Sequence, residues 1–365
     1  MIWLGTLWLA MMWTTLLVLV AIVVVFLLLR RRRHDSSHER NREKNPAPVY
    51  PPDDVRQQVL ERIEAMHGVT QGLRGNARVK ALRDYMDSLS DGLDLASEVR
   101  PGGGGAPPGE WVIGPGALPG RRILYIHGGS WIAGSPRSHR AITDRLSVLA
   151  RASVFAIDYR LMPENLFMTG VADCRQGYRW LLENGPDGPE AASFMVVAGD
   201  SSGGSHALSL LAWIRDQRLQ APDAAVALSP STELMITGLG GRANIDSDPM
   251  LGPTVKKLAK MPAPMLWWGT LMGLRISPTN PVASPLRGSL NNLPHTLIQV
   301  SESEILLDNA RRYADKASKA GSTVELQTWP DMVHVWHLFT PLLPEANEAF
   351  EAIQDFLERV EHHQL

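Results

Sequence analysis

One serine stands between glycines where an apolar run gives way to a helical run, in the segment Gly199-Asp200-Ser201-Ser202-Gly203. The run before it, Phe194–Ala198, reads as a buried strand, and the run from Gly204 reads as a helix. A G-x-S-x-G pattern between strand and helix is typical of a nucleophilic serine, because the sharp turn exposes the hydroxyl and the glycines avoid Cβ clashes. The pattern indicates covalent catalysis by Ser201, with a simple glycine-rich turn as the alternative.

A second small-residue segment, His127-Gly128-Gly129-Ser130-Trp131, follows the apolar run Ile123–Ile126 and begins 74 residues before Ser201. Small residues let backbone N–H groups point into a site, where they can stabilise a developing oxyanion. We expect His127 to hold this loop by hydrogen bonds rather than to act as a base. A tight turn after a strand is the alternative for this segment taken alone.

A serine hydroxyl needs a base, and the base needs a third group that orients it. The expected order along the chain is serine, then acid, then histidine. His334 lies in the loop after the predicted strand Val324–Thr328 and is the expected base, with His337 as the alternative. His206 comes too early, because it lies on the helix of the nucleophile.

The loop after the predicted strand Thr296–Val300 offers three carboxylates as the acid, Glu302, Glu304 and Asp308. We favour Glu304, which precedes His334 by 30 residues. Glu302 is the alternative, and Asp308 could orient the following helical turn instead. Any of the three could also simply be solvated at a helix start, where acidic residues are favoured.

Taken together, five ordered segments resemble the hormone-sensitive-lipase-like (family IV) esterases of the α/β-hydrolase fold, over roughly Val55 to the C-terminus. These segments are HGGSW, Asp158-Tyr159-Arg160-Leu161-Met162-Pro163-Glu164, GDSSGG, Glu304-Ile305-Leu306-Leu307-Asp308 and Met332-Val333-His334-Val335-Trp336-His337. By this resemblance Ser201 is the nucleophile, His334 the base and Glu304 the acid. The family's oxyanion-hole amides map to Gly128, Gly129 and Ser202.

The chain departs from the family pattern at several of these motifs. Ser130 stands at the last glycine of HGGG, and Ser202 adds a hydroxyl beside the nucleophile. The usual D-P-L acid motif reads Glu304-Ile305-Leu306, which resembles a glutamate subgroup of bacterial lactone and acetyl-ester hydrolases. Met162 replaces a small residue before Pro163.

Four large side chains are expected to bind substrate, namely Trp131, Met162, Trp267 and Trp268. They would line or cover the acyl pocket, or else form the core of a cap. Because large side chains shorten an acyl pocket, we expect a carboxylesterase for short- to medium-chain acyl esters. A lipase, a lactonase or an amide or carbamate hydrolase with the same triad, and a non-catalytic binding protein with this fold, are the alternatives.

Strand-like and helix-like runs alternate after residue 120, which favours a mostly parallel sheet covered on both faces. The predicted strands are Ile123–Ile126, Val154–Ile157, Phe194–Ala198, Ala225–Leu228, Thr296–Val300 and Val324–Thr328. The chain is long enough for an eight-stranded α/β-hydrolase sheet. We expect a helical cap from about 55–95 and from the insertion 233–285.

The N-terminal run Ile2–Leu29 contains 28 residues without a charge, and Arg30 to Arg33 follow it directly. Such a run is long enough for a transmembrane helix, and basic residues stay on the cytoplasmic side. A cleaved signal peptide is the alternative. We therefore expect an anchor and basic stop at 1–33, a linker at 34–54 and a cytoplasmic hydrolase domain at 55–365, in a single-pass membrane protein.

Composition excludes several other classes. A net charge of −2 over 365 residues gives no basic field for nucleic acid. The single cysteine, Cys174, excludes an intramolecular disulfide framework and a cysteine-based metal cluster. We expect neither metal nor cofactor, and a small-molecule ester as the partner; the resemblance also allows a homodimer.

Overall fold

In the computed structural model, which describes residues 54–234 and 243–363, an eight-stranded sheet has the strand order β1-β2-β4-β3-β7-β8-β9-β10. Its strands are β1 (Glu98–Pro101), β2 (Gly109–Ile113), β3 (Arg121–Ile126), β4 (Ser153–Ile157), β7 (Phe194–Asp200), β8 (Ala224–Leu228), β9 (His295–Ser301) and β10 (Val324–Trp329). β2 is antiparallel to both β1 and β4, and the other pairings are parallel. A short separate hairpin joins β5 (Asn184–Gly185) to β6 (Gly188–Pro189). This is the mostly parallel sheet expected for an α/β hydrolase, and it contains every strand that the sequence predicts.

Helices cover both faces of the sheet. One face carries α4 (Arg140–Ala150) and α11 (Pro344–Glu361), and the other carries α5 (Phe167–Glu183), α6 (Ser201–Asp216) and α10 (Leu307–Lys319). In β3, Ile123 and Tyr125 pack on the α4 and α11 side, whereas Leu124 and Ile126 pack on the other side. Because both faces are covered, central strands such as β4 and β8 carry almost only apolar residues instead of alternating.

Parallel pairing brings the loops that carry the candidate chemistry to one edge. The serine follows β7, the carboxylate candidates follow β9, and the histidine candidates follow β10. β7, β8, β9 and β10 are consecutive neighbours in the sheet. The loops at their C-terminal ends therefore lie near one another, although the first and the last of them are more than a hundred residues apart in sequence.

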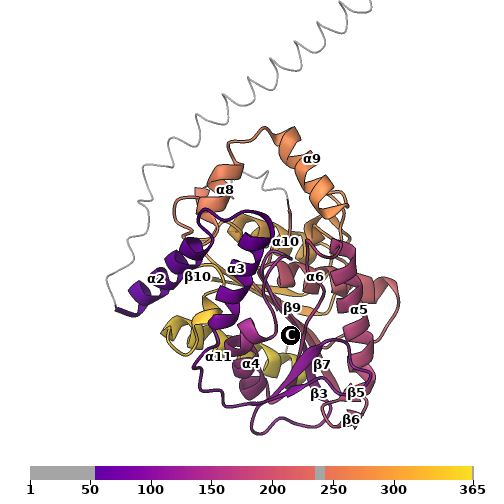
Figure 1. Ribbon diagram of the computed structural model, residues 1–365. Helices are drawn as coiled ribbons and strands as arrows, with labels where there is room; N and C mark the ends of the chain where they lie inside the picture. Colours follow the sequence, from indigo (N-terminus) through magenta and orange to yellow (C-terminus); the bar gives the residue numbers. More distant parts are fainter. Residues whose placement is uncertain (1–53, 235–242, 364–365) are drawn as a thin grey trace, which may run out of the picture. The chain divides into compact units, whose positions relative to one another are not determined.

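Four further helices lie outside the two layers, α2 (Asp54–Val69), α3 (Gly75–Ser88), α8 (Gly252–Leu258) and α9 (Ala263–Leu274). α2 buries Val59 and Ile63 against the segment around Trp336. Figure 1 shows α8 and α9, in orange, at the end of this domain opposite the β5–β6 hairpin. Short 3₁₀ turns complete the fold, η1 (Arg137–His139), η2 (Pro285–Arg287) and η3 (Trp336–Phe339).

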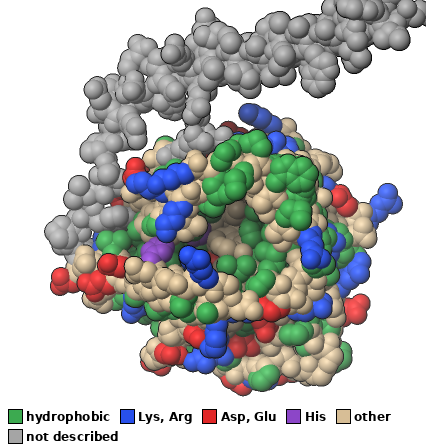
Figure 2. Space-filling view, turned by 45° about the horizontal axis from the view of Figure 1, so that its top comes forward, with side chains coloured by type: hydrophobic (Ala, Val, Ile, Leu, Met, Phe, Trp, Pro, Cys, Tyr) green, Lys and Arg blue, Asp and Glu red, His purple; other side chains and the backbone are tan. Residues whose placement is uncertain are grey.

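Hydrophobic side chains are exposed on the α8–α9 end of the domain. Figure 2 brings that end forward and shows hydrophobic groups beside a hollow, with Lys and Arg side chains among them. The exposed large hydrophobic residues of these two helices are Leu258, Met265, Trp268 and Met272. These four side chains therefore face outwards rather than into the two cores that flank the sheet.

The expectation of a transmembrane helix is corrected by the structure. Crossing a bilayer takes about 20 consecutive apolar residues. No helix within 54–234 or 243–363 is long and apolar enough, since α11, the longest there, has 18 residues and is amphipathic. The run Ile2–Leu29 and Arg30 to Arg33, on which the expectation rested, lie outside the described residues. We keep the α/β-hydrolase fold and withdraw the spanning helix, the single-pass membrane placement and the cytoplasmic assignment.

Candidate active site

Ser201 occupies a sharp turn between β7 and α6. Its φ of 50° lies in the left-handed region, which a non-glycine residue rarely adopts. The neighbouring glycines are required by space, because a Cβ on Gly203 would lie 2.0 Å from the Ile126 carbonyl oxygen. A Cβ on Gly128 would lie 3.0 Å from the Ser201 Cβ. The close packing of these two loops therefore explains the glycines around the serine.

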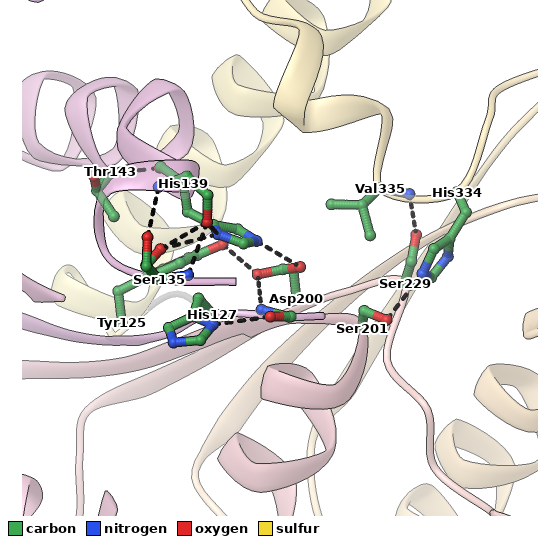
Figure 3. A network of polar contacts seen from close by, with 12 residues as sticks. Tyr125, His127, Ser135, His139, Thr143, Asp200, Ser201, Ser229, His334 and Val335 are labelled. Atoms are coloured by element: carbon green, nitrogen blue, oxygen red, sulfur yellow. Dashed lines mark hydrogen bonds and ion pairs between the residues drawn. The ribbon is translucent and has the colours of Figure 1, made fainter. Parts of the chain in front are cut away.

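The structure brings Ser201, His334 and Glu304 into one hydrogen-bonded line. His334 Nε2 lies 2.9 Å from Ser201 Oγ, and His334 Nδ1 lies 2.5 Å from Glu304 Oε2. His334 and Glu304 are both buried. Because a carboxylate can only accept, Nδ1 carries the proton and Nε2 is left to accept the proton of the serine hydroxyl. Figure 3 shows His334 directed at Ser201 from the loop that follows β10.

The electrostatics of His334 follow from its burial and its acidic partner. Burial alone would lower its pKa, but the hydrogen bond from its ring to Glu304 and the charge of that carboxylate outweigh burial, so the pKa of His334 is raised above 6.5. Glu304 therefore stabilises the imidazolium that forms when His334, acting as the base, takes a proton.

Glu304 is fixed on its other oxygen by two donors. Oε1 accepts hydrogen bonds from the Ser229 hydroxyl at 2.8 Å and from the Ser301 amide at 2.6 Å. Glu302 is instead exposed and accepts a hydrogen bond from Thr328. Asp308 lies on α10, within 3.9 Å of Arg312. Of the three carboxylates, Glu304 alone contacts His334 among the described residues.

The two other histidines considered, His337 and His206, are buried and contact groups other than Ser201. His337 is buried, and its Nε2 lies 2.8 Å from Gln299 Oε1. His206 packs against Trp131 and Phe167. Burial lowers the pKa of both His337 and His206 to about 3. Both rings are therefore neutral structural groups at ordinary pH, and His334 is the histidine that reaches the serine.

Three consecutive left-handed residues shape the loop after β3. Their φ angles are 114° at Gly129, 56° at Ser130 and 62° at Trp131. A Cβ on Gly129 would lie 2.1 Å from the Ala133 carbonyl oxygen, so no other residue fits there. Ser130 adopts a conformation that glycine adopts without strain, which explains physically why a glycine is the usual residue at this position.

The amide of Gly128 is already used in the structure, which corrects one expected oxyanion donor. It donates to Asp200 Oδ1 at 2.9 Å and therefore points at that carboxylate rather than into the site. The Ser202 amide lies in the first turn of α6, where helical N–H groups have no partner within the helix. Gly129 and Ser202 remain as the candidate donors.

Asp200 is the centre of a buried network that the sequence did not single out. Tyr125 Oη donates to its Oδ1 at 2.6 Å, and His139 Nε2 lies 3.4 Å from its Oδ2 (Figure 3). His127 adds a further brace, since it stacks on Tyr159 and Tyr159 donates to the His127 carbonyl. His127 is thus structural, as expected. The only sequence signal for Asp200 was its position immediately before Ser201.

Arg83 on α3 is a second residue that the sequence did not reveal. Its guanidinium donates to the Ile132 carbonyl at 2.7 Å, to the Met162 carbonyl at 2.9 Å and to both oxygens of Glu164. The Met162 amide in turn donates to the Trp131 carbonyl. Arg83 therefore ties the loop after β3 to the 158–164 segment, which explains the glutamate of that motif.

The four expected substrate-binding residues separate into two pairs. Trp131 and Met162 both pack against a small buried cluster that contains Phe167 and Leu274. Trp267 and Trp268 instead pack on each other on α9, and Trp268 is 59% exposed. The structure thus places Trp131 in the loop after β3 with Met162 beside it, whereas Trp267 and Trp268 lie on α9.

Comparison with known proteins agrees with this fold. A family described as alpha/beta hydrolase fold matches residues 123–338. An acetyl-hydrolase of Streptomyces hygroscopicus is 39% identical over 69% of this chain and 83% of its own length. The carboxylesterase/phospholipase LipF of Mycobacterium tuberculosis is 36% identical over 65% of this chain and 62% of its own length.

Solved structures give the same result. An esterase of the bacterial hormone-sensitive lipase family superposes with a TM-score of 0.73 and 31% identity, covering 85% of this chain and 99% of its own. A hormone-sensitive lipase from a metagenome library gives a TM-score of 0.71 and 28% identity, covering 84% and 98%. The chain belongs to the α/β-hydrolase-fold family. Within it, the chain is a carboxylic-ester hydrolase of the hormone-sensitive-lipase-like group.

Proposed function

We propose that this chain is a serine carboxylesterase that hydrolyses short- to medium-chain acyl esters through an acyl-enzyme. The observation that carries the proposal is the line of contacts from Ser201 Oγ through His334 to Glu304, at 2.9 and 2.5 Å. A hydroxyl held this way can lose its proton to Nε2 as it attacks an ester carbonyl. Glu304 stabilises the imidazolium that results.

In the first half of the reaction, Ser201 Oγ bonds to the acyl carbon and its proton passes to His334. The negative charge that develops on the carbonyl oxygen is held by the amides of Gly129 and Ser202. His334 then gives its proton to the alcohol as it leaves. In the second half, His334 takes a proton from water, which attacks the acyl-enzyme and releases the acid with Ser201 restored.

The preference for shorter acyl chains has two supports. The relative that is 39% identical is named an acetyl-hydrolase. Trp131, in the oxyanion loop, and Met162, bonded to it, are bulky residues that would limit the depth of an acyl pocket. The name of LipF, carboxylesterase/phospholipase, favours lipid esters as the second candidate substrate class.

The helices outside the two layers, α2, α3, α8 and α9, are the natural candidates for a cap over this site. They fall within the expected cap regions 55–95 and 233–285, and the expected domain boundaries remain a prediction. α2 supports this role, because it packs on the segment that carries His334.

The test is hydrolysis of p-nitrophenyl esters from C2 to C16 by the native chain and by Ser201→Ala. We expect turnover to fall by a factor on the order of 10⁶ in the variant and to be fastest at C2 to C6 in the native chain. Ser209→Ala, on the same helix, is the matched control and should keep native turnover. Retained turnover in Ser201→Ala would refute the mechanism, and a maximum at C12 or longer would favour a lipase.

A further inference from the structure

Side chains from the insertion between β8 and β9 form hydrogen bonds with the backbone of the loop that carries Glu304. Asn244 Nδ2 donates to the Glu302 carbonyl at 2.7 Å and to the Glu304 carbonyl at 2.9 Å. Ser247 Oγ donates to the Ser303 carbonyl at 2.9 Å. These contacts bind the carbonyls of the acid and of the two residues before it, from a segment more than 50 residues away in sequence.

Asp248 completes this set of contacts as an acceptor, whereas Asn244 and Ser247 are donors. Its Oδ2 accepts a hydrogen bond from the Ile305 amide at 3.1 Å. Its Oδ1 accepts from the Met250 amide at 3.0 Å and from the Leu251 amide at 2.8 Å, just before α8 begins. Asp248 is only 2% exposed, so its carboxylate is fully committed to these amides. One side chain therefore links the start of α8 to the residue that follows the acid.

We propose that Asn244, Ser247 and Asp248 form a clamp that positions the catalytic acid, so that the insertion carrying α8 and α9 is part of the triad's support. This proposal rests on the proposed function, because it assigns the clamp to Glu304 of the same triad. These three are positioning residues, since none of them contacts Ser201 or the imidazole directly. Glu304 must keep its carboxylate 2.5 Å from His334 Nδ1 while its backbone is held from outside the sheet.

The clamp explains how an irregular loop can hold a precisely placed acid. β9 ends at Ser301 and α10 begins at Leu307, so the residues between them have no regular ladder of hydrogen bonds. Among the described residues the carbonyls of Glu302 and Ser303 accept no backbone hydrogen bond, whereas the Glu304 carbonyl also accepts one from the Leu307 amide at 3.3 Å. Side-chain donors and an acceptor from the insertion replace those bonds, and a displacement of about 1 Å at a catalytic group can cost about 100-fold in rate.

Asp248 also acts through its charge. Besides Glu304, the charged or titratable groups that act on the His334 ring are Asp248, Asp200 and His337. The negative charge of Asp248 contributes to the raised pKa of His334. Its removal should make the imidazolium less stable, so the acid limb of kcat/KM should move to lower pH.

The experiment compares Asn244→Ala and Asp248→Asn with the native chain on p-nitrophenyl butyrate from pH 5 to 9. We expect kcat to fall roughly 10- to 100-fold in both variants while KM changes less than about threefold. Only Asp248→Asn should shift the acid limb to lower pH, because Asn244 carries no charge. The matched control is Asp246→Asn. Asp246 lies two residues before Asp248, and its exposed carboxylate pairs with Lys256.

Far-UV circular dichroism and thermal unfolding establish that each variant is folded. If Asp248→Asn does not fold, Asn244→Ala and the milder Ser247→Ala decide the question through kcat. Folded clamp variants with kcat within about twofold of native would overturn the proposal while leaving the triad intact. Turnover that survives Ser201→Ala would instead refute the proposed function, so the two failures are distinguishable.

Discussion

The carboxylate of Asp200 lies 2.9 Å from the backbone nitrogen of Gly128 and accepts its hydrogen bond. These residues are 72 positions apart: Gly128 lies in the loop after β3, and Asp200 ends β7 directly before Ser201. The contact fixes the start of the oxyanion loop against the nucleophile turn. It also means that the residue before Ser201 contributes to the site by placing a backbone segment.

Asp200→Ala should therefore destabilise the protein strongly. It would leave the Tyr125 hydroxyl and the Gly128 amide buried without an acceptor, at about 1–3 kcal/mol for each group. Asp200→Asn should cost less, because its remaining oxygen can still accept both bonds. Urea unfolding followed by tryptophan fluorescence measures the difference. Asp216→Ala, at the exposed end of α6, is the control, and equal losses in Asp200→Ala and Asp216→Ala would contradict the expected role.

Ser130→Gly should stabilise the chain. Ser130 has a φ of 56°, and a non-glycine residue in the left-handed region costs about 1–2 kcal/mol, partly offset by the greater entropy of an unfolded glycine. We expect a net gain of about 0.5–1 kcal/mol in the free energy of unfolding. Gly129→Ala is the opposite control, since its Cβ would clash with the Ala133 carbonyl. A loss of stability in Ser130→Gly would show that the serine side chain makes a compensating contact.

Glu304→Gln should change both the rate and its pH dependence. The carboxylate raises the pKa of His334 above 6.5, and the ring is a base only when neutral, so native activity should rise as pH passes upward through that raised pKa. Without the negative charge the pKa falls, and the acid limb of kcat/KM should move to lower pH. We expect kcat at neutral pH to fall by about 10³–10⁴. Glu302→Gln, two residues away and exposed, should leave the profile unchanged, and an identical profile in both variants would contradict the role of Glu304.

Arg83→Lys should loosen the oxyanion loop. A lysine cannot reproduce the planar set of donors that reaches two carbonyls and both oxygens of Glu164. We expect a loss of about 1–2 kcal/mol in the free energy of unfolding and a severalfold lower kcat. Arg78→Lys, exposed on the same helix, is the control for the substitution itself. A native kcat in Arg83→Lys would show that the loop keeps its shape without α3.

Local patterns in the sequence were sufficient to predict the six strands from β3 to β10 that carry the site and the order of the chemical groups. Runs such as Val154–Ile157 are apolar throughout because both faces of the sheet are covered, and this signal needs no partner to be visible. Glycine around Ser201 likewise marks a turn that only small residues allow. The strands β1 and β2 were missed, because β1 is a four-residue edge strand and β2 is only five residues long, and such short runs carry little periodic signal.

The sequence by itself determined that a serine, a carboxylate and a histidine follow successive strand ends in the order an α/β hydrolase needs. Only the tertiary structure decided that His334 rather than His337 faces Ser201, that Glu304 rather than Glu302 is buried beside it, and that Trp268 lies outside. It also decided that the Gly128 amide belongs to Asp200 and that Asn244 and Asp248 hold the acid loop. The physical reason is that the chemical type of a side chain and the element it belongs to can be inferred from neighbouring residues in the sequence. Its contact partner, by contrast, is set by packing between segments far apart along the chain.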